Sequence, residues 1–191
     1  MAFTDYLDLR TAVLEAVGRT DISDVFDRLT LLAESRFNRE LRCRDQITNT
    51  TITVSGGSGA LPADYREMIG VYTPNGCEYV EQPLQAAQAT GNHYYAVSGS
   101  TIIATDQDYA AQYYASIPTL TTSLTTSNWL LQKYPEVYLH GVSAEAAKHI
   151  RDAEAVPILE QYRNAAIFEA QADDHRQRYS RTRVRLTGNI E

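Results

Sequence analysis

The sequence predicts a mainly helical α+β fold with about four helices, a small antiparallel β-meander inserted between them, and an extended C-terminal arm. Three observations support this fold class. Apolar residues recur at helical spacing near both ends of the chain, β-branched residues alternate in its middle, and the last seventeen residues hold five arginines but few apolar residues. The length of 191 residues is that of one domain with a substantial core.

The first helix is expected over residues 4–18. Thr4 can cap its N-terminus, because a threonine hydroxyl can accept a hydrogen bond from a free backbone N–H group of the first turn. Gly18 can end the helix, because glycine adopts the left-handed conformation without a steric penalty.

The second helix is expected over residues 21–45 and has the clearest amphipathic pattern of the chain. Its apolar stripe consists of Ile22, Val25, Phe26, Leu29, Leu32, Ala33, Phe37 and Leu41. Its polar side carries Arg36, Glu40 and Arg44 at i,i+4 spacing, which predicts ion pairs on a solvated helix face.

The β-insertion is expected over residues 47–118, where short alternating segments are separated by turn residues such as those of 55–59. The strand candidates are 48–54, 67–73, 78–80, 94–97, 101–104 and 109–117, and 83–90 is interpreted as a short helical interruption. Short strands joined by tight turns favour an antiparallel meander.

Two further helical segments are expected over 128–151 and 153–178. Asn128 can cap a short helix, and Pro135 suits the first turn of the next one. One apolar stripe comprises Tyr138, Val142, Ala146 and Ile150, and the other comprises Val156, Leu159, Tyr162, Ala166 and Ala170. A short connection makes the two helices antiparallel, and the core is predicted to contain Phe26, Leu29, Phe37, Tyr138, Val142, Ile150 and Leu159.

The charge of the chain is unevenly distributed. Residues 175–191 carry five arginines and one glutamate, a net charge of +4, whereas residues 1–174 carry 12 basic and 23 acidic side chains, a net charge of −11. A basic segment with so few apolar residues is typical of an arm that becomes ordered on a partner, and its structural alternative is a frayed C-terminus.

The sequence contains no motif that indicates an enzyme. It has neither a phosphate-binding nor a dinucleotide-binding glycine pattern, so no cofactor is expected. Glu136/His140 and Glu145/His149 have i,i+4 spacing, but a metal site would need further ligands, so none is predicted. Cys43 and Cys77 are interpreted as free thiols.

No apolar run approaches the roughly 20 residues that span a bilayer. The N-terminus has neither a basic region nor an apolar region of the kind found in signal peptides. We therefore expect no transmembrane segment, no signal peptide and no membrane partner.

An ordered set of segments resembles the head–tail adaptor (connector) proteins of tailed bacteriophages. These segments are Leu32-Ala-Glu-Ser-Arg-Phe-Asn-Arg-Glu-Leu-Arg42, Leu61-Pro-Ala-Asp-Tyr65, Tyr94-Tyr-Ala-Val-Ser-Gly99, Tyr113-Tyr-Ala-Ser-Ile-Pro-Thr-Leu120 and Asn128-Trp-Leu-Leu-Gln-Lys-Tyr-Pro-Glu-Val-Tyr-Leu139. No single segment is specific, but their order covers most of the chain. The resemblance implies a helical bundle with a β-insertion, residues 1–174, followed by a basic arm, residues 175–191, that overlaps the end of the last helix.

The resemblance also implies a structural protein of the virion neck, at the head–tail junction, that is assembled in the host cytoplasm. About twelve copies would form a ring beneath the portal, extend the DNA channel and join the capsid to the tail or to another neck protein. Genomic DNA would pass an acidic wall without sequence-specific binding. The arm residues expected to dock on the portal are Arg176, Arg178, Tyr179, Arg181, Arg183, Arg185 and Leu186. The residues expected to contact a neighbouring subunit or the tail are Tyr94, Tyr95, Tyr109, Tyr113 and Tyr114.

Two other function classes remain open. A nucleic-acid-binding protein could use the arginine-rich tail, although the net charge of −11 on residues 1–174 opposes DNA binding. A virion hydrolase would need a carboxylate or histidine whose mutation abolishes cell-wall digestion.

Overall fold

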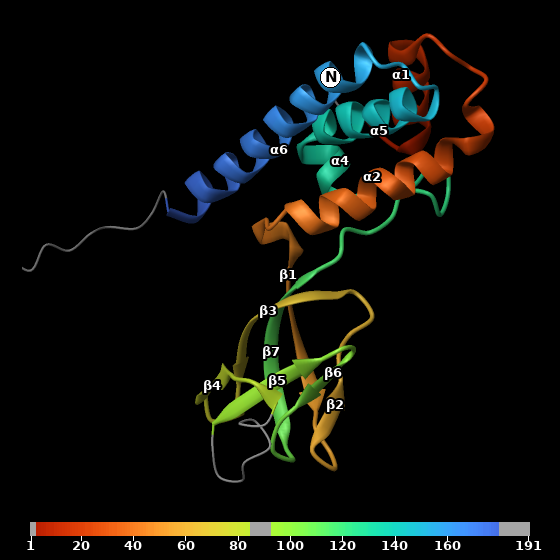
Figure 1. The fold of residues 1–191 in the computed structure, drawn as a ribbon. Helices are drawn as coiled ribbons and strands as arrows, with labels where there is room; N and C mark the ends of the chain where they lie inside the picture. The colour runs from red at the N-terminus through yellow and green to blue at the C-terminus, as the bar shows by residue number, and fades with distance from the viewer. Residues whose placement is uncertain (1–2, 85–92, 180–191) are drawn as a thin grey trace, which may run out of the picture. The chain divides into compact units, whose positions relative to one another are not determined.

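The computed structural model describes residues 3–84 and 93–179, which divide into two compact units (Figure 1). A helical unit comprises residues up to 44 and residues from 117 onward, and a β unit comprises residues 45–116. Most of the short helix expected over 83–90 lies outside the described residues, as does the arm beyond residue 179.

The predicted fold class was wrong about the amount of β structure and about the type of sheet. Of the residues that the structure describes, 46% are helical and 23% lie in strands, and these strands form one seven-stranded mixed sheet rather than a small antiparallel meander in a mainly helical bundle. The strands are β1 (Ile47–Thr53), β2 (Ser58–Ala60), β3 (Tyr65–Tyr72), β4 (Glu78–Glu81), β5 (Tyr94–Ser98), β6 (Thr101–Ile103) and β7 (Asp108–Ala115). The segment 55–59, which was expected to be only a turn, contains the start of β2.

The order of the strands explains why the sheet is not a meander. The order is β1-β7-β3-β4-β5-β6-β2, so the last strand lies between the first and the third. The hairpins β3–β4 and β5–β6 are antiparallel as expected, but β4 and β5 are parallel. Residues 82–93 connect them, and a connection of about a dozen residues is long enough for a parallel crossover. Turn residues act over a few neighbouring positions, so they do not predict pairing between strands that are distant in sequence.

The two ends of the strand order approach one another, so the sheet is nearly closed into a barrel. Gly59 on β2 lies against β1, and a Cβ atom there would stand 2.8 Å from the carbonyl oxygen of Thr53. The interior is filled by a separate core that includes Ile52, Val71, Tyr79, Ile102 and Tyr109. The β unit therefore has an apolar interior of its own.

The helical unit begins with α1 (Tyr6–Val17). Its cap is Asp5 rather than Thr4: the Asp5 side chain accepts a hydrogen bond from the backbone N–H of Asp8. Gly18 ends the helix in the left-handed conformation, with φ of 67°, as predicted.

Helix α2 (Phe26–Glu40) follows a short 3-10 turn and is shorter than the expected 21–45. Leu41 adopts an extended conformation, with φ of −85° and ψ of 136°. Leu41 and Cys43 are both fully buried. Residues two apart point the same way on an extended chain but nearly opposite ways on a helix, so burying both favours the early end of α2.

The C-terminal helices follow the sequence prediction closely. Asn128 caps α4 (Trp129–Lys133), Pro135 begins α5 (Pro135–His149), and α6 (Ala155–Tyr179) runs back along α5 (Figure 1). Helix α5 contacts α1, α2, α4 and α6. It is accordingly buried on nearly all sides, with Val137, Tyr138, Val142 and Ala146 in the core.

The predicted core was largely correct. Phe26, Leu29, Phe37, Tyr138 and Val142 are buried, and Ile150 and Leu159 are partly buried. Two residues placed on buried stripes are exposed instead: Leu32 on α2 at 55% and Tyr162 on α6 at 53%. The buried side of α6 is rotated toward Arg163 and Ile167, because Arg163 forms ion pairs inside the unit.

Candidate functional site

The root of the predicted docking arm is the last turn of α6. Arg178 pairs with the buried Asp174, its Nε atom 2.6 Å from Oδ2. Asp174 also accepts a hydrogen bond of 2.8 Å from the backbone N–H of Arg44. The Arg176 side chain is 75% exposed, with its nearest carboxylate, that of Asp173, at 3.8 Å. Arg178 therefore helps to fix the end of α6, whereas Arg176 is available to a partner.

The other predicted arm residues cannot be placed in the same way. Tyr179 is the last residue of α6. Arg181, Arg183, Arg185 and Leu186 lie outside the described residues. Their role in portal docking stays a prediction.

Three of the five tyrosines predicted to contact a partner are buried inside the β unit. Tyr109 is fully buried, and its hydroxyl donates to the carbonyl oxygen of Thr105 at 2.9 Å. Tyr113 donates to Asp64 Oδ1 at 3.0 Å, and burial raises its pKa to about 12. Tyr95 is 4% exposed. These three tyrosines are positioned to stabilise the sheet.

Tyr94 and Tyr114 are partly exposed, because residues alternate between the two faces of a strand. Tyr94 precedes the buried Tyr95 on β5, and Tyr114 follows the buried Tyr113 on β7. A contact of these two side chains with a neighbouring subunit or with the tail stays a prediction.

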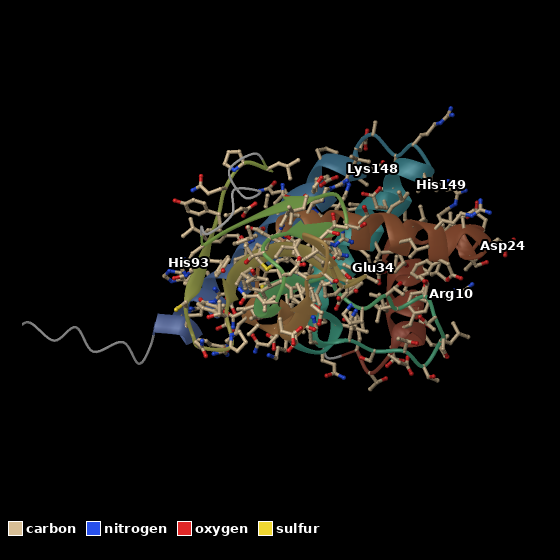
Figure 2. All side chains as sticks on the ribbon, turned by 90° about the horizontal axis from the view of Figure 1, so that it is seen from below. Arg10, Asp24, Glu34, His93, Lys148 and His149 are labelled. Atoms are coloured by element: carbon tan, nitrogen blue, oxygen red, sulfur yellow. The ribbon has the colours of Figure 1, made fainter. Side chains whose placement is uncertain are left out.

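A buried carboxylate fixes the segment that re-enters the helical unit after β7. Glu34 on α2, which is labelled in Figure 2, is 4% exposed. It accepts hydrogen bonds from the backbone N–H of Leu120 at 2.9 Å, from the hydroxyl of Thr119 at 2.7 Å and from that of Tyr138 at 3.1 Å. Burial raises its pKa, although these bonds lower it in part. These three hydrogen bonds indicate a structural role for this carboxyl group.

The polar side of α2 makes ion pairs between helices rather than the expected pairs along its own face. Arg36 Nη1 lies 3.0 Å from Glu145 on α5 and 2.9 Å from Glu160 on α6. Glu160 also pairs with Lys148, which is labelled in Figure 2. Burial alone would raise the pKa of Glu160, but hydrogen bonds from Lys148 and Arg36 outweigh it and lower the pKa.

A third cation, Arg163, extends this cluster and is itself buried. Arg163 is 6% exposed and reaches Glu40 at 3.1 Å and Glu160 at 3.3 Å. The carboxylates of the cluster are thus matched by cations, which suits a structural connection among α2, α5 and α6.

The histidine pairs noted in the sequence do not gather further ligands. His140 packs its ring 5.4 Å from that of Tyr162, and Glu145 pairs with Arg36 and Lys148. Among residues 3–84 and 93–179, no group of three potential ligands could hold a metal ion. The carboxylates of Asp106 and Asp108 accept hydrogen bonds from Gly57 and Thr53, respectively.

Cys43 is buried and Cys77 is exposed, and neither forms a disulfide bond. No helix in the described part of the chain has both the length and the apolar character needed to cross a bilayer.

Two exposed apolar faces on the helices were not predicted from the sequence. On α6 the exposed side chains are those of Ile158, Tyr162 and Phe168, with exposed fractions of 53%, 53% and 71%. On α2 they are Leu31 and Leu32, at 47% and 55%. Because both helices also carry buried apolar residues, their apolar periodicity alone does not distinguish the outer stripe from the inner one.

The family model described as SU10 adaptor protein matches residues 4–188. No curated protein matches the chain. The matched range includes both compact units and most of the arginine-rich tail.

Proposed function

The chain belongs to the SU10 adaptor protein family of bacteriophage adaptors, and from this membership we propose that it forms a ring beneath the portal and joins the capsid to the tail. The observation that carries the proposal is the extent of the match, residues 4–188. An adaptor is a structural component of the virion, so the proposed activity is assembly and not catalysis.

The proposed ring has about twelve subunits, and its inner wall extends the channel for genomic DNA. The net charge of −11 on residues 1–174 supports this part of the proposal. An acidic wall repels phosphate groups, so DNA can pass without binding tightly. Tyr94 and Tyr114 are the partly exposed candidates for contact with a neighbour or with the tail.

The arm is proposed to dock on an acidic surface of the portal. Alternation of Arg181, Arg183 and Arg185 would place these side chains on one side of an extended chain. Guanidinium groups can bind carboxylates through two hydrogen bonds each. Arg176 and Arg178 at the end of α6 would lie at the start of this docking segment.

Truncation tests the role of the arm. Deleting residues 180–191 leaves α6 complete to Tyr179, and so removes the distal arginines without shortening the described helix. We expect the truncated chain to keep the wild-type thermal midpoint and to lose co-migration with portal-bearing capsids on a density gradient. Arg181→Glu with Arg183→Glu should weaken attachment more than Glu191→Gln. If the truncated chain attached to portal-bearing capsids as fully as the wild type, the tail would be a frayed C-terminus and not the docking segment.

The alternative function, nucleic-acid binding through the tail, gives a different result. It requires a DNA affinity that falls steeply with salt and disappears in the same truncation. The adaptor proposal expects only weak binding of this kind, because the acidic body opposes it.

A further inference from the structure

The outer face of α6 is unusually apolar for an exposed helix surface. Ile158, Tyr162, Ala165 and Phe168 follow one another at spacings of four, three and three residues, which places them on one side of a helix with 3.6 residues per turn. Ala166 and Ala170 face the core instead. A phenylalanine exposed at 71% beside other apolar side chains is typical of a surface that a protein partner covers.

Two hollows flank this stripe. Ile158 lines an apolar one of about 230 Å³ together with Val17, Ile150 and Leu159. The other, of about 270 Å³, lies between α5 and α6 and is lined by Glu136, Glu169, Lys133 and Ala166 among others. Glu136 and Glu169 are exposed, and neither has an ion pair within the described residues. We refer to Ile158, Tyr162, Ala165, Phe168, Glu136 and Glu169 as the α6 face.

The outer face of α2 has the opposite charge. Arg28, Leu31, Leu32, Ser35 and Arg39 are exposed at spacings that place them on one side of the helix, and we refer to them as the α2 face. Across the ranges that the structure describes, neither guanidinium group is in an ion pair. The α2 face therefore combines two leucines with two unpaired cations, whereas the α6 face combines apolar residues with two acids.

One chain cannot bring its own two faces together. The buried sides of α2 and α6 meet inside the helical unit, where Arg36 pairs with Glu160 and Arg163 pairs with Glu40. The outer stripe of α6 lies on the far side of that helix from Glu160 and Arg163, and the outer stripe of α2 lies outside its buried side, with Arg36 at its edge. A head-to-tail ring contact requires two different, complementary surfaces that face different directions on each subunit.

We propose that the α6 face of one subunit docks on the α2 face of the next copy of this chain. Phe168 and Tyr162 then cover Leu31 and Leu32, and Arg28 and Arg39 meet the carboxylates of Glu136 and Glu169. This inference rests on the proposed ring, because it names the surfaces through which that ring closes.

Disulfide trapping tests the pairing of the two faces. In a Cys77→Ser background, one set of chains carries Leu32→Cys and a second, size-tagged set carries Phe168→Cys; Cys43 is buried and stays in place. Assembled on portal and oxidised, the mixture should yield the mixed dimer and neither self-pair. A chain with both cysteines should yield a ladder of multimers. Leu7→Cys, on α1 and 47% exposed, is the matched control and should yield no cross-link with either cysteine.

Charge reversal tests the same contact without a new covalent bond. Arg28→Glu with Arg39→Glu should lower ring occupancy on the portal at least tenfold, and adding Glu136→Lys with Glu169→Lys to the same chain should restore most of it. Restoration cannot result from a merely misfolded variant, and the thermal midpoints of all variants should match that of the wild type.

The outcomes separate this inference from the proposed function. If the wild-type chain forms a ring on the portal but the double arginine variant assembles equally well, the α2 face is not the ring contact and only this inference fails. Cross-linking of Phe168→Cys to the portal or to a tail protein, in place of a second copy, also overturns it. If the wild-type chain does not associate with the portal, the proposed function itself fails.

Discussion

At the scale of single residues, Glu34 shows how one buried carboxyl group can fix a long segment of chain. It is the shared acceptor for Thr119, Leu120 and Tyr138. Asn128 strengthens the arrangement, because its side-chain amide donates to the Pro118 carbonyl oxygen and to the Tyr138 hydroxyl, at 2.6 Å and 2.8 Å. The segment that follows β7 is thereby fastened to α2 and α5 by polar contacts.

Glu34→Ala should lower the free energy of unfolding by about 1–3 kcal/mol, because the buried N–H of Leu120 loses its acceptor. Glu34→Gln keeps one acceptor oxygen and should cost less. Chemical denaturation of the three proteins at neutral pH checks this order. Equal stability of the alanine variant and the wild type would show that water satisfies the donor.

The pH dependence of Glu34 has a definite sign. Burial raises its pKa above the usual 4.5, so the folded protein holds the proton more tightly than the unfolded chain. The stabilisation is complete below the unfolded pKa and is lost as pH rises through the folded pKa. The unfolding free energy of the wild type, minus that of Glu34→Gln, should therefore fall as pH rises above about 4.5. A difference that is flat or rises with pH contradicts this assignment.

Gly141 permits the closest approach of α5 to α2. A Cβ atom at this position would stand 2.3 Å from Cζ of Phe37, whose fully buried ring packs edge-on against Tyr138. Gly141→Ala gains about 1 kcal/mol of helix propensity but should lose about 1–3 kcal/mol through overpacking, so the net effect is destabilising. Denaturation of Gly141→Ala with and without Phe37→Leu measures the coupling. Strictly additive effects would show that the ring is not the obstacle.

At the scale of elements, the end of a helix was predictable where a local signal sets it. Gly18 ends α1, Asn128 caps α4 and Pro135 begins α5, and each signal acts within a few residues. The premature end of α2 was not predictable in this way. It depends on burial of Leu41 and Cys43 in a core formed largely by residues distant in sequence.

The sheet and the helix surfaces show the same limit. The strand candidates 67–73 with 78–80, and 94–97 with 101–104, correctly predicted two antiparallel hairpins. The insertion of β7 between β1 and β3 depends on long-range pairing, which no local pattern reports. Among the predicted contact tyrosines, alternation alone could separate Tyr113 from Tyr114 but could not show which of them faces inward. The outer stripe of α6 was not predicted because the buried side of this helix includes Arg163. An apolar pattern does not place a charged residue in a core.

The turn between α5 and α6 yields an element-scale prediction. Arg151 has a positive φ of 59°, and the Asp152 side chain caps α6 by accepting from the backbone N–H of Ala155 at 3.0 Å. Arg151→Gly should leave stability unchanged or raise it by up to about 1 kcal/mol, because glycine adopts this conformation without strain. Asp152→Ala should lower it by about 0.5–2 kcal/mol. Thermal unfolding checks both; a clear loss for Arg151→Gly would mean that the arginine side chain stabilises the turn.

At the scale of the whole molecule, the chain combines two units with separate cores, an acidic body and a basic C-terminal segment. The buried carboxyl groups of Glu34 and Glu145 are held by a backbone N–H donor and by a guanidinium group, respectively. The apolar side chains left exposed on α2 and α6 suit a protein whose function is to contact other proteins. This organisation agrees with membership in an adaptor family.

The free chain should differ from the assembled one in its oligomeric state. Head-to-tail contacts close into a ring only when the rotation between subunits is fixed, and the portal supplies that template in the proposed assembly. Light scattering should therefore show a monomer or weakly associated species in the absence of portal. A stable closed ring of the isolated chain would mean that no template is needed.

Electron microscopy of the purified portal, with and without this protein, tests the central claim most directly. The account predicts an additional ring of density beneath the portal, coaxial with its channel, only when the protein is present. Side views should show the added layer on one end of the portal and an open channel in end views. Portal particles that are identical with and without the protein, at concentrations where both remain folded, would contradict the claim that this chain is a head–tail adaptor.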